Sequence, residues 1–215
     1  MKIGIDIDGV ILDYERTMNT YAELYDLLIL KKDGKKHPQE FSPLKKYDWT
    51  EEERKAFVNT FYVYATINLT PFIPMAKEML ELFQAEGYDY VFITARGTTI
   101  KETKPAVIEV FKRNNLSVDN IYWAVEEKVP KCKELGIDLM IEDNPSTCKK
   151  LKENKIKVLY FRDKNSEVIP EDEYLTEVSS VGDICRYLFK INGFNNSKEV
   201  YKRILLKNDK KKITQ

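Results

Sequence analysis

Two aspartates separated by one residue close the first apolar segment of the chain. Asp6 and Asp8 follow Ile3 and Ile5, and Gly9 comes directly after them. Side chains in a strand alternate with a period of two, so both carboxylates point to the same side while the extended conformation persists. Such a pair can share one metal ion or one substrate. Exposed turns also carry paired aspartates, so this pair alone is weak evidence of catalysis.

Two further polar groups lie where later strands are expected to end. One contains Thr94 and Arg96, and the other contains Glu142 and Asp143. Ligands of open parallel sheets bind at the carboxyl ends of the strands. Four carboxylates gathered there would repel by about 4 kcal/mol per pair at about 4 Å and an effective dielectric of about 20. A bound cation removes this repulsion, and oxygen ligands favour a hard ion such as Mg²⁺.

These residue types are suited to phosphoryl transfer. One aspartate can attack phosphorus, a second can act as general acid and base, and the metal ion can neutralise the charge of the incoming phosphate. Arg96 fits two interpretations equally well, a contact to an anionic substrate and an ion pair with a surface carboxylate. The only histidine, His37, falls in a predicted loop and is not needed as a ligand.

The elements that position these residues follow a regular pattern from residue 75 onward. Apolar runs of strand length alternate with amphipathic segments of about ten residues. We predict strands over 2–7, 88–94, 120–123, 138–142 and 157–161, and helices over 75–86, 101–114, 129–135, 146–153 and 181–191. This alternation is typical of right-handed βαβ units. It predicts an α/β fold with a doubly wound parallel sheet and helices on both of its faces.

Residues 14–69 interrupt this pattern after the first strand. Apolar and aromatic residues recur there at helical spacing on both sides of the polar stretch 31–43. Connections between a strand and the next helix are usually only a few residues long, so we predict that 14–69 form a small helical cap. The catalytic core would then comprise residues 1–13 and 70–192, and residues 193–215 would form a helix and a basic tail.

The cap aromatics are expected to be core residues, because their spacing suits an apolar helix face. They are Tyr47, Trp49, Phe57, Phe61, Tyr62 and Tyr64. The alternative is that one or two of them stack on a base.

Three segments resemble motifs of the haloacid-dehalogenase superfamily of phosphohydrolases. The segment 6–10 (DIDGV) resembles the first motif, 93–96 (ITAR) is similar to the second, and 141–144 (IEDN) is similar to the acidic fourth. The resemblance covers residues 1–13 and 70–161, in the right order and with plausible spacing. The early cap and the ITAR segment resemble the 5'(3')-deoxyribonucleotidase-like branch of the superfamily.

The resemblance implies a role for each residue of these motifs. Asp6 would be the nucleophile that forms an aspartyl-phosphate, and Asp8 would protonate the leaving oxygen and later activate water. Thr94 would hydrogen-bond the phosphoryl oxygens, and Ala95 and Arg96 would contribute to substrate binding.

The resemblance also implies a Mg²⁺ site. Its ligands would be the carboxylate of Asp6, the backbone carbonyl of Asp8 and the carboxylate of Asp143. Glu142 would lie near this ligand set or belong to it.

The third motif of the superfamily supplies a lysine that balances the charges of the phosphate and the nucleophile. Lys128 fits best for this catalytic and substrate-binding role, because Pro130 follows it closely and proline suits the first turn of a helix. Lys131 lies close by and is the alternative.

Composition restricts the classes of partner. Lys plus Arg and Asp plus Glu both count 35, so no net basic field exists to attract a nucleic-acid polymer. No stretch resembles a signal peptide or a membrane span. The cysteines Cys132, Cys148 and Cys185 form no CxxC pair, which favours reduced packing thiols and a cytoplasmic location.

The sequence therefore predicts a Mg²⁺-dependent phosphatase for a small phosphorylated metabolite, such as a (deoxy)nucleoside monophosphate. A sugar phosphate or a phosphorylated cell-surface precursor is the alternative substrate. Phospho-receiver domains share the acidic cluster, but they are shorter, lack such a cap and place the phospho-acceptor on a later strand. A binding protein without turnover and a phosphonate hydrolase with a cap lysine are further alternatives.

Overall fold

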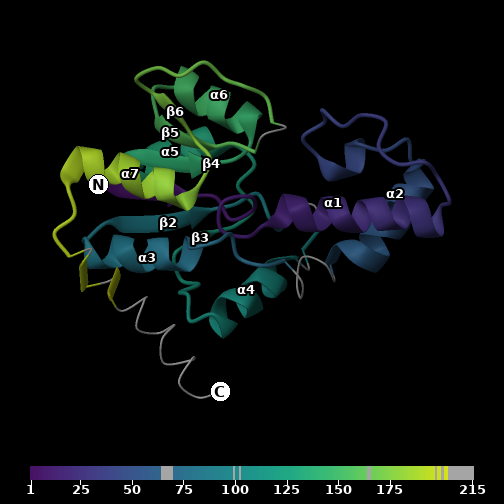
Figure 1. The fold of residues 1–215 in the computed structure, drawn as a ribbon, viewed down its shortest axis with the longest axis horizontal. Coiled ribbons are helices and arrows are strands. Elements are labelled where there is room, and N and C mark those ends of the chain that lie inside the picture. Colours follow the sequence, from purple (N-terminus) through teal and green to yellow (C-terminus); the bar gives the residue numbers. More distant parts are fainter. Residues whose placement is uncertain are drawn as a thin grey trace.

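Six parallel strands form one sheet in the order β3-β2-β1-β4-β5-β6 (Figure 1). The computed structural model describes residues 1–63, 70–98, 100–101, 103–163, 166–196, 198–199 and 201–202. The strands are β1 (Lys2–Ile5), β2 (Asp89–Ile93), β3 (Ile121–Tyr122), β4 (Leu139–Glu142), β5 (Lys157–Phe161) and β6 (Leu175–Val178). Every neighbouring pair is parallel. The predicted doubly wound α/β fold is thus confirmed.

Helices cover both faces of the sheet because the strand side chains alternate between two apolar clusters. In β4, Leu139 and Ile141 face one cluster and Met140 faces the other. Fully burying each such side chain contributes roughly 1.5–3 kcal/mol. The first face is covered by α3 (Ala76–Ala85), α4 (Thr103–Arg113) and α7 (Val181–Asn192), and the second by α5 (Lys128–Leu135) and α6 (Pro145–Glu153).

Most of the predicted core elements are present, with ends shifted by one or two residues. The edge strand β6 was not predicted, because only Leu175 and Val178 of its four residues are buried. The helix α6 begins at Pro145, one residue before its predicted start. Asn144 is the cap, since its Oδ1 accepts hydrogen bonds from the backbone nitrogens of Ser146 at 2.9 Å and Thr147 at 3.2 Å.

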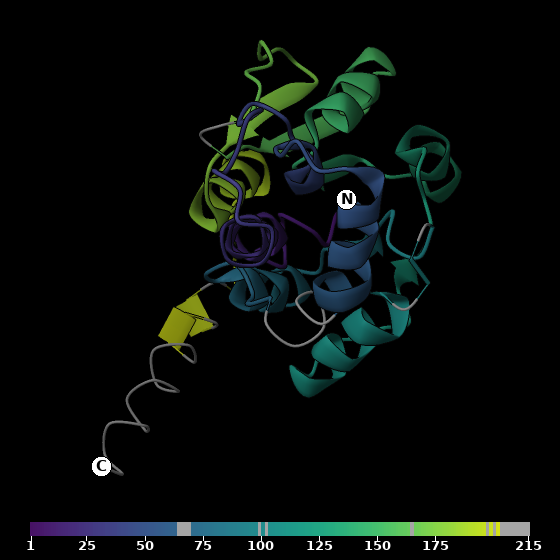
Figure 2. The same cartoon turned by 90° about the vertical axis from the view of Figure 1, so that its right-hand side faces the viewer.

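The segment that follows β1 is helical and projects from one end of the sheet (Figure 1). It contains α1 (Tyr14–Leu24) and α2 (Glu51–Phe57), and each helix continues into a π-helical turn, over Tyr25–Ile29 and Val58–Tyr62 respectively. Figure 2 views the molecule from this side, with α1 seen end-on.

The chain leaves the sheet for this helical segment and returns to it at one point. The backbone nitrogen of Asp13 donates to the carbonyl oxygen of Pro71 at 2.8 Å, and that of Ile73 donates to the carbonyl oxygen of Ile11 at 2.9 Å. We call residues 14–63 the insertion.

The insertion has an apolar core of its own, separate from the two clusters of the sheet. Tyr47 and Trp49 stack with their ring centroids 4.7 Å apart, and Phe57 is buried against Trp49. The buried carboxylate of Asp26 accepts hydrogen bonds from Trp49 Nε1 and from the backbone nitrogen of Gly34, both at 2.7 Å. These contacts fix the loop before α2 against the π-helical turn that follows α1.

Several sequence-based predictions concern the remaining parts of the chain. Among the described residues, no helix is long and apolar enough to cross a membrane. Cys132, Cys148 and Cys185 are unpaired. Tyr64 and the lysine run 210–212 lie outside the described residues.

Candidate active site

Three strands bring their carboxyl ends together where the winding of the sheet reverses. β1 lies between β2 and β4 and is followed by Asp6, while Thr94 follows β2 and Glu142 ends β4. The backbone nitrogen of Asp6 donates to the carbonyl oxygen of Ile141 at 2.9 Å, and that of Thr94 donates to Tyr122 at 3.0 Å. This switch point is the usual ligand crevice of an open parallel sheet.

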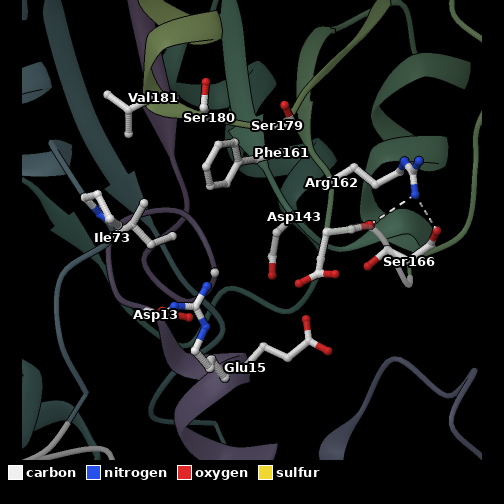
Figure 3. A pocket seen from close by; sticks show the side chains of 14 residues that line it. Asp13, Glu15, Ile73, Asp143, Phe161, Arg162, Ser166, Ser179, Ser180 and Val181 are labelled. Carbon is white, nitrogen blue, oxygen red and sulfur yellow. Dashed lines mark hydrogen bonds and ion pairs between the residues drawn. The ribbon is translucent and has the colours of Figure 1, made fainter.

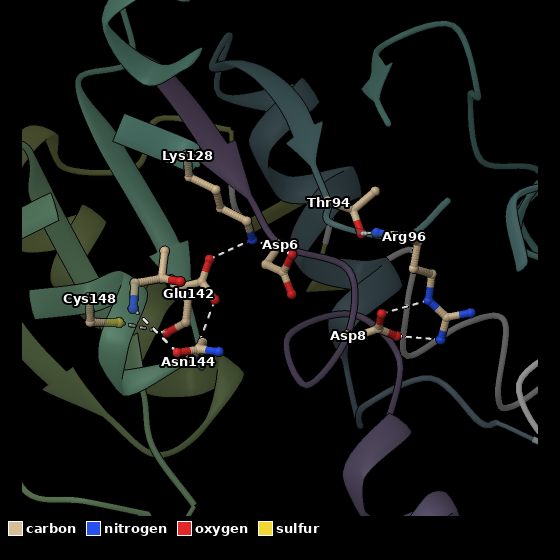
Figure 4. A network of polar contacts seen from close by, with 9 residues as sticks. Asp6, Asp8, Thr94, Arg96, Lys128, Glu142, Asn144 and Cys148 are labelled. Carbon is tan, nitrogen blue, oxygen red and sulfur yellow. Dashed lines mark hydrogen bonds and ion pairs between the residues drawn. The ribbon is translucent and has the colours of Figure 1, made fainter. Parts of the chain in front are cut away.

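Lys128, the first residue of α5, is the cation at the centre of the site. Its Nζ donates to Oδ1 of Asp6 at 2.5 Å and to Oε2 of Glu142 at 2.6 Å (Figure 4). Burial opposes the charge of this ammonium, but the two carboxylates outweigh burial and raise the pKa of Lys128 above its usual value. The alternative lysine, Lys131, lies at the surface and pairs with Glu134 at 2.6 Å.

The carboxylates of the site destabilise one another. One oxygen from each of Asp6, Glu142 and Asp143 lies within 4.8 Å of the others. Burial raises the pKa of Asp6 to about 7, with Lys128 opposing this shift and Glu142 adding to it. Burial also raises the pKa of Asp143 well above its usual value, and the charges of Asp6 and Glu142 add to the shift.

The charge balance of the site fits a divalent cation. Four carboxylates face two cationic side chains, which leaves an excess of two negative charges when all six groups are ionised. They are Asp6, Asp8, Glu142 and Asp143 on one side, and Arg96 and Lys128 on the other. An all-oxygen donor set of this kind suits Mg²⁺.

Glu142 and Asp143, two candidate metal ligands, differ in their hydrogen bonds. Both oxygens of Glu142 are engaged, one by Lys128 at 2.6 Å and one by the backbone nitrogen of Asn144 at 3.1 Å. Within the part of the chain that the structure describes, the carboxylate of Asp143 accepts no hydrogen bond. The geometry therefore favours Asp143 as a ligand and leaves Glu142 to hold Lys128 in place.

Gly9 is packed directly against Asp143. It adopts φ +75°, and a Cβ placed on it would lie 1.9 Å from Oδ2 of Asp143. Both the backbone conformation and the close approach therefore require glycine.

We expect Gly9→Ala to cost at least about 1–2 kcal/mol of stability from backbone strain alone, with a further loss from the clash with Asp143. Thermal denaturation would measure this change. Gly87→Ala is the matched control, because Gly87 has φ +73° and nothing within 4 Å of the added Cβ. Equal losses in the two variants would contradict the close packing of Gly9 on Asp143.

The two aspartates of the first motif have different partners. Asp8 points away from Asp6 toward Arg96 (Figure 4). Arg96 Nε donates to Oδ2 of Asp8 at 2.5 Å, and Arg96 Nη2 donates to Oδ1. From the sequence, Arg96 could either contact an anionic substrate or pair with a surface carboxylate. In the structure it forms an ion pair, and its partner is Asp8 of the site.

A cavity of about 280 Å³ opens onto these groups. Of the predicted site residues, Asp6, Asp8, Thr94, Ala95, Lys128, Glu142 and Asp143 line it, whereas Arg96 lies behind Asp8.

The insertion supplies part of the wall of this cavity. The residues concerned are Tyr14, Glu15, Phe41 and Pro43. Sequence reasoning missed them, because Phe41 and Pro43 belong to a stretch with the composition of an ordinary polar loop. Tyr47, Trp49 and Phe57 belong to the core of the insertion instead.

Asp143 also faces a second cavity of about 270 Å³ (Figure 3). Its lining includes Asp13 before α1, Phe161 at the end of β5, and Ser180 before α7. Asp143 thus lines both cavities.

Comparisons with known proteins address the fold. No family model and no curated protein matches the sequence. Solved structures of haloacid-dehalogenase-like hydrolases do match the structure. One from Deinococcus radiodurans, with bound phosphate and sodium, has a TM-score of 0.61 and 13% identity, and covers 90% of this chain and 97% of its own.

Two further matches have similar extent. A predicted phosphoglycolate phosphatase from Haemophilus somnus has a TM-score of 0.60 and 14% identity over 86% of this chain and 96% of its own. A haloacid dehalogenase-like hydrolase from Streptococcus pneumoniae has a TM-score of 0.59 and 13% identity over 87% of this chain and 97% of its own. The chain therefore has the fold of the haloacid-dehalogenase-like hydrolases.

Proposed function

We propose that this protein is a Mg²⁺-dependent phosphohydrolase that transfers the phosphoryl group of a small phosphomonoester to Asp6 and then to water. The observation that carries the proposal is the buried contact of Lys128 with both Asp6 and Glu142, with a carboxylate oxygen of Asp143 within 4.8 Å. This arrangement lies at the switch point of the sheet, and a predicted phosphoglycolate phosphatase has a similar fold.

In the first step, a carboxylate oxygen of Asp6 attacks phosphorus, and the bond between phosphorus and the leaving oxygen breaks. Asp8 gives a proton to that leaving oxygen, so the alcohol departs neutral. Lys128 fixes the orientation of Asp6 and offers positive charge to the transferring group. Thr94 lines the cavity together with Asp8 and Lys128, and it would donate a hydrogen bond to a phosphoryl oxygen.

In the second step, water attacks the phosphorus of the aspartyl-phosphate, and Asp8 accepts the proton of that water. Inorganic phosphate leaves, and both carboxylates return to their starting state. When bound, Mg²⁺ would neutralise phosphate charge. Asp6 and Asp143 would hold this ion.

We expect Asp143→Asn to raise the melting temperature in EDTA and to reduce the stabilisation that added Mg²⁺ gives. The substitution removes one of the mutually repelling carboxylates, and it also removes a proposed ligand of the ion. Thermal denaturation with EDTA and with Mg²⁺ would measure both effects. Asp119→Asn, at an exposed position, is the control. An unchanged response to Mg²⁺ in Asp143→Asn would exclude Asp143 as a ligand.

For the substrate, we propose a (deoxy)nucleoside monophosphate. The insertion places the aromatic side chains of Tyr14 and Phe41 in the cavity wall, and aromatic rings stack well on planar groups. The cavity of about 280 Å³ favours a small molecule over a polymer. A phosphorylated sugar is the alternative, since such a substrate could use the polar side chains of Glu15 and Glu126 in the same wall.

The test is phosphate release from a panel of nucleoside monophosphates, sugar phosphates and phosphoglycolate, with Mg²⁺ and with EDTA. We expect Mg²⁺-dependent release, fastest from nucleoside monophosphates. Faster release from sugar phosphates would overturn the substrate assignment only. No release from any compound would contradict the proposed phosphohydrolase.

A further inference from the structure

A chain of contacts connects Asp8 to the insertion. Arg96 lies between Asp8 and the ring of Tyr14, whose centroid is 5.3 Å from the guanidinium carbon. The hydroxyl of Tyr14 donates in turn to the hydroxyl of Tyr62 at 3.1 Å. Tyr14 begins α1 and Tyr62 ends the π-helical turn after α2, so the contacts run from the sheet into both helices of the insertion.

The guanidinium fixes the carboxylate of Asp8 in one orientation. Two of its nitrogens, Nε and Nη2, each donate to a different oxygen of Asp8. A bidentate pair of this kind sets the plane of the carboxylate, which the single ammonium of a lysine cannot do. Arg96 is only 6% exposed, so water does not compete freely for these donors.

The backbone of Arg96 is held as firmly as its side chain. Its nitrogen donates to Oγ1 of Thr94 at 3.1 Å, and its carbonyl oxygen accepts from the nitrogen of Ala124 at 2.9 Å. Arg96 is therefore a fixed support for Asp8. Arg96 lies behind Asp8 and does not line the cavity. Its side chain can therefore influence the reaction only through its contact with Asp8.

We propose that Arg96 is a positioning residue that sets the carboxylate of Asp8 for proton transfer, and that Tyr14 and Tyr62 couple this setting to the insertion. The proposal rests on the proposed phosphohydrolase, in which Asp8 gives a proton to the leaving oxygen. That oxygen then departs from phosphorus as an alcohol. In the protonated form, one oxygen of Asp8 carries the proton and the other keeps its hydrogen bond from Arg96. After the transfer, both oxygens again accept from the guanidinium, as they do in the structure.

The proposal predicts a dependence on the leaving group that a purely structural role of Arg96 would not produce. An alkyl phosphate needs its leaving oxygen protonated, whereas p-nitrophenol leaves readily as an anion. General acid catalysis typically contributes roughly 10²–10⁴-fold. We therefore expect Arg96→Gln to lower kcat/KM on the order of 10²-fold for an alkyl phosphate and less than about tenfold for p-nitrophenyl phosphate.

The parameter kcat/KM is chosen because it covers the steps through departure of the leaving group. Arg96→Lys should give an intermediate loss of the same selective kind, and it carries the test if Arg96→Gln does not fold. Asp8→Asn combined with Arg96→Gln should be no slower on the alkyl phosphate than Asp8→Asn alone, since Arg96 acts through Asp8. Tyr62→Phe should give a smaller loss that is again confined to the alkyl phosphate.

Arg186→Gln is the matched control, because Arg186 is an exposed arginine that pairs with Asp183 on α7. It should leave both rates unchanged. Equal losses on both substrates in folded Arg96 variants, or additive losses in the double variant, would overturn the positioning role. An unaffected Tyr62→Phe would overturn the coupling to the insertion. A wild-type protein that hydrolyses neither substrate would instead contradict the proposed function.

Discussion

Asp6→Asn is expected to lower kcat by roughly 10⁴-fold or more, because the amide cannot attack phosphorus and the reaction loses its nucleophile. The fold should tolerate the change. Asparagine has nearly the shape of aspartate, and Lys128 keeps its second contact, to Glu142 at 2.6 Å. Phosphate release measures the first effect, and the melting temperature measures the second.

Asp138→Asn provides the matched control for this variant. Asp138 is an exposed aspartate that accepts a hydrogen bond at 2.7 Å from the backbone nitrogen of Lys2, at the amino end of β1. It thus contacts the strand that Asp6 follows, but at the amino end of that strand. We expect its kcat to match that of the wild type. Substantial turnover in Asp6→Asn would remove Asp6 from the role of nucleophile.

Lys128→Met is expected to destabilise the protein by about 3–5 kcal/mol, the usual cost of breaking a buried ion pair from one side. The methionine would leave Asp6 and Glu142, which are 5% and 1% exposed, without their shared cation. Turnover should also be lost, because Asp6 loses the group that orients it. Urea denaturation of the metal-free protein would give the change in the free energy of unfolding.

Two further variants show whether this loss comes from the buried charges. Lys131→Met removes a surface lysine that pairs with Glu134, and exposed pairs contribute only about 0–1 kcal/mol. Adding Glu142→Gln to Lys128→Met should restore part of the lost stability, since one uncompensated charge disappears. Lys128→Met would contradict this interpretation if it were as mild as Lys131→Met.

Part of the site could be predicted from the sequence. Strands and helices depend on local periodicity, and the carboxyl ends of parallel strands lie at one edge, so Asp6, Thr94 and Glu142 could be expected to converge. Lys128 could be preferred over Lys131 from the position of Pro130 in the first turn of α5. The structure places the Nζ of Lys128 on Asp6.

Contacts made across the fold could not be predicted in this way. Phe41 and Pro43 reach the cavity only because the core of the insertion fixes the loop that carries them. The composition of a loop does not predict where the loop lies in the fold. The pairing of Arg96 with Asp8 likewise depends on how two strand ends are spaced. β6 was missed because only two of its four residues are buried, and so short an edge strand shows too weak a hydrophobic periodicity to be predicted.

The most direct test of the proposed chemistry is to trap the phosphorylated protein during turnover. The Asp8→Asn variant would be mixed with p-nitrophenyl phosphate and Mg²⁺, quenched with acid and digested, and its peptides analysed by mass spectrometry. We predict a phosphoryl group on the peptide that contains Asp6, because p-nitrophenol can leave without Asp8 while hydrolysis of the aspartyl-phosphate cannot proceed efficiently without it. Release of p-nitrophenol with no phosphorylated Asp6, or with the phosphoryl group on another residue, would contradict the role of Asp6 as nucleophile.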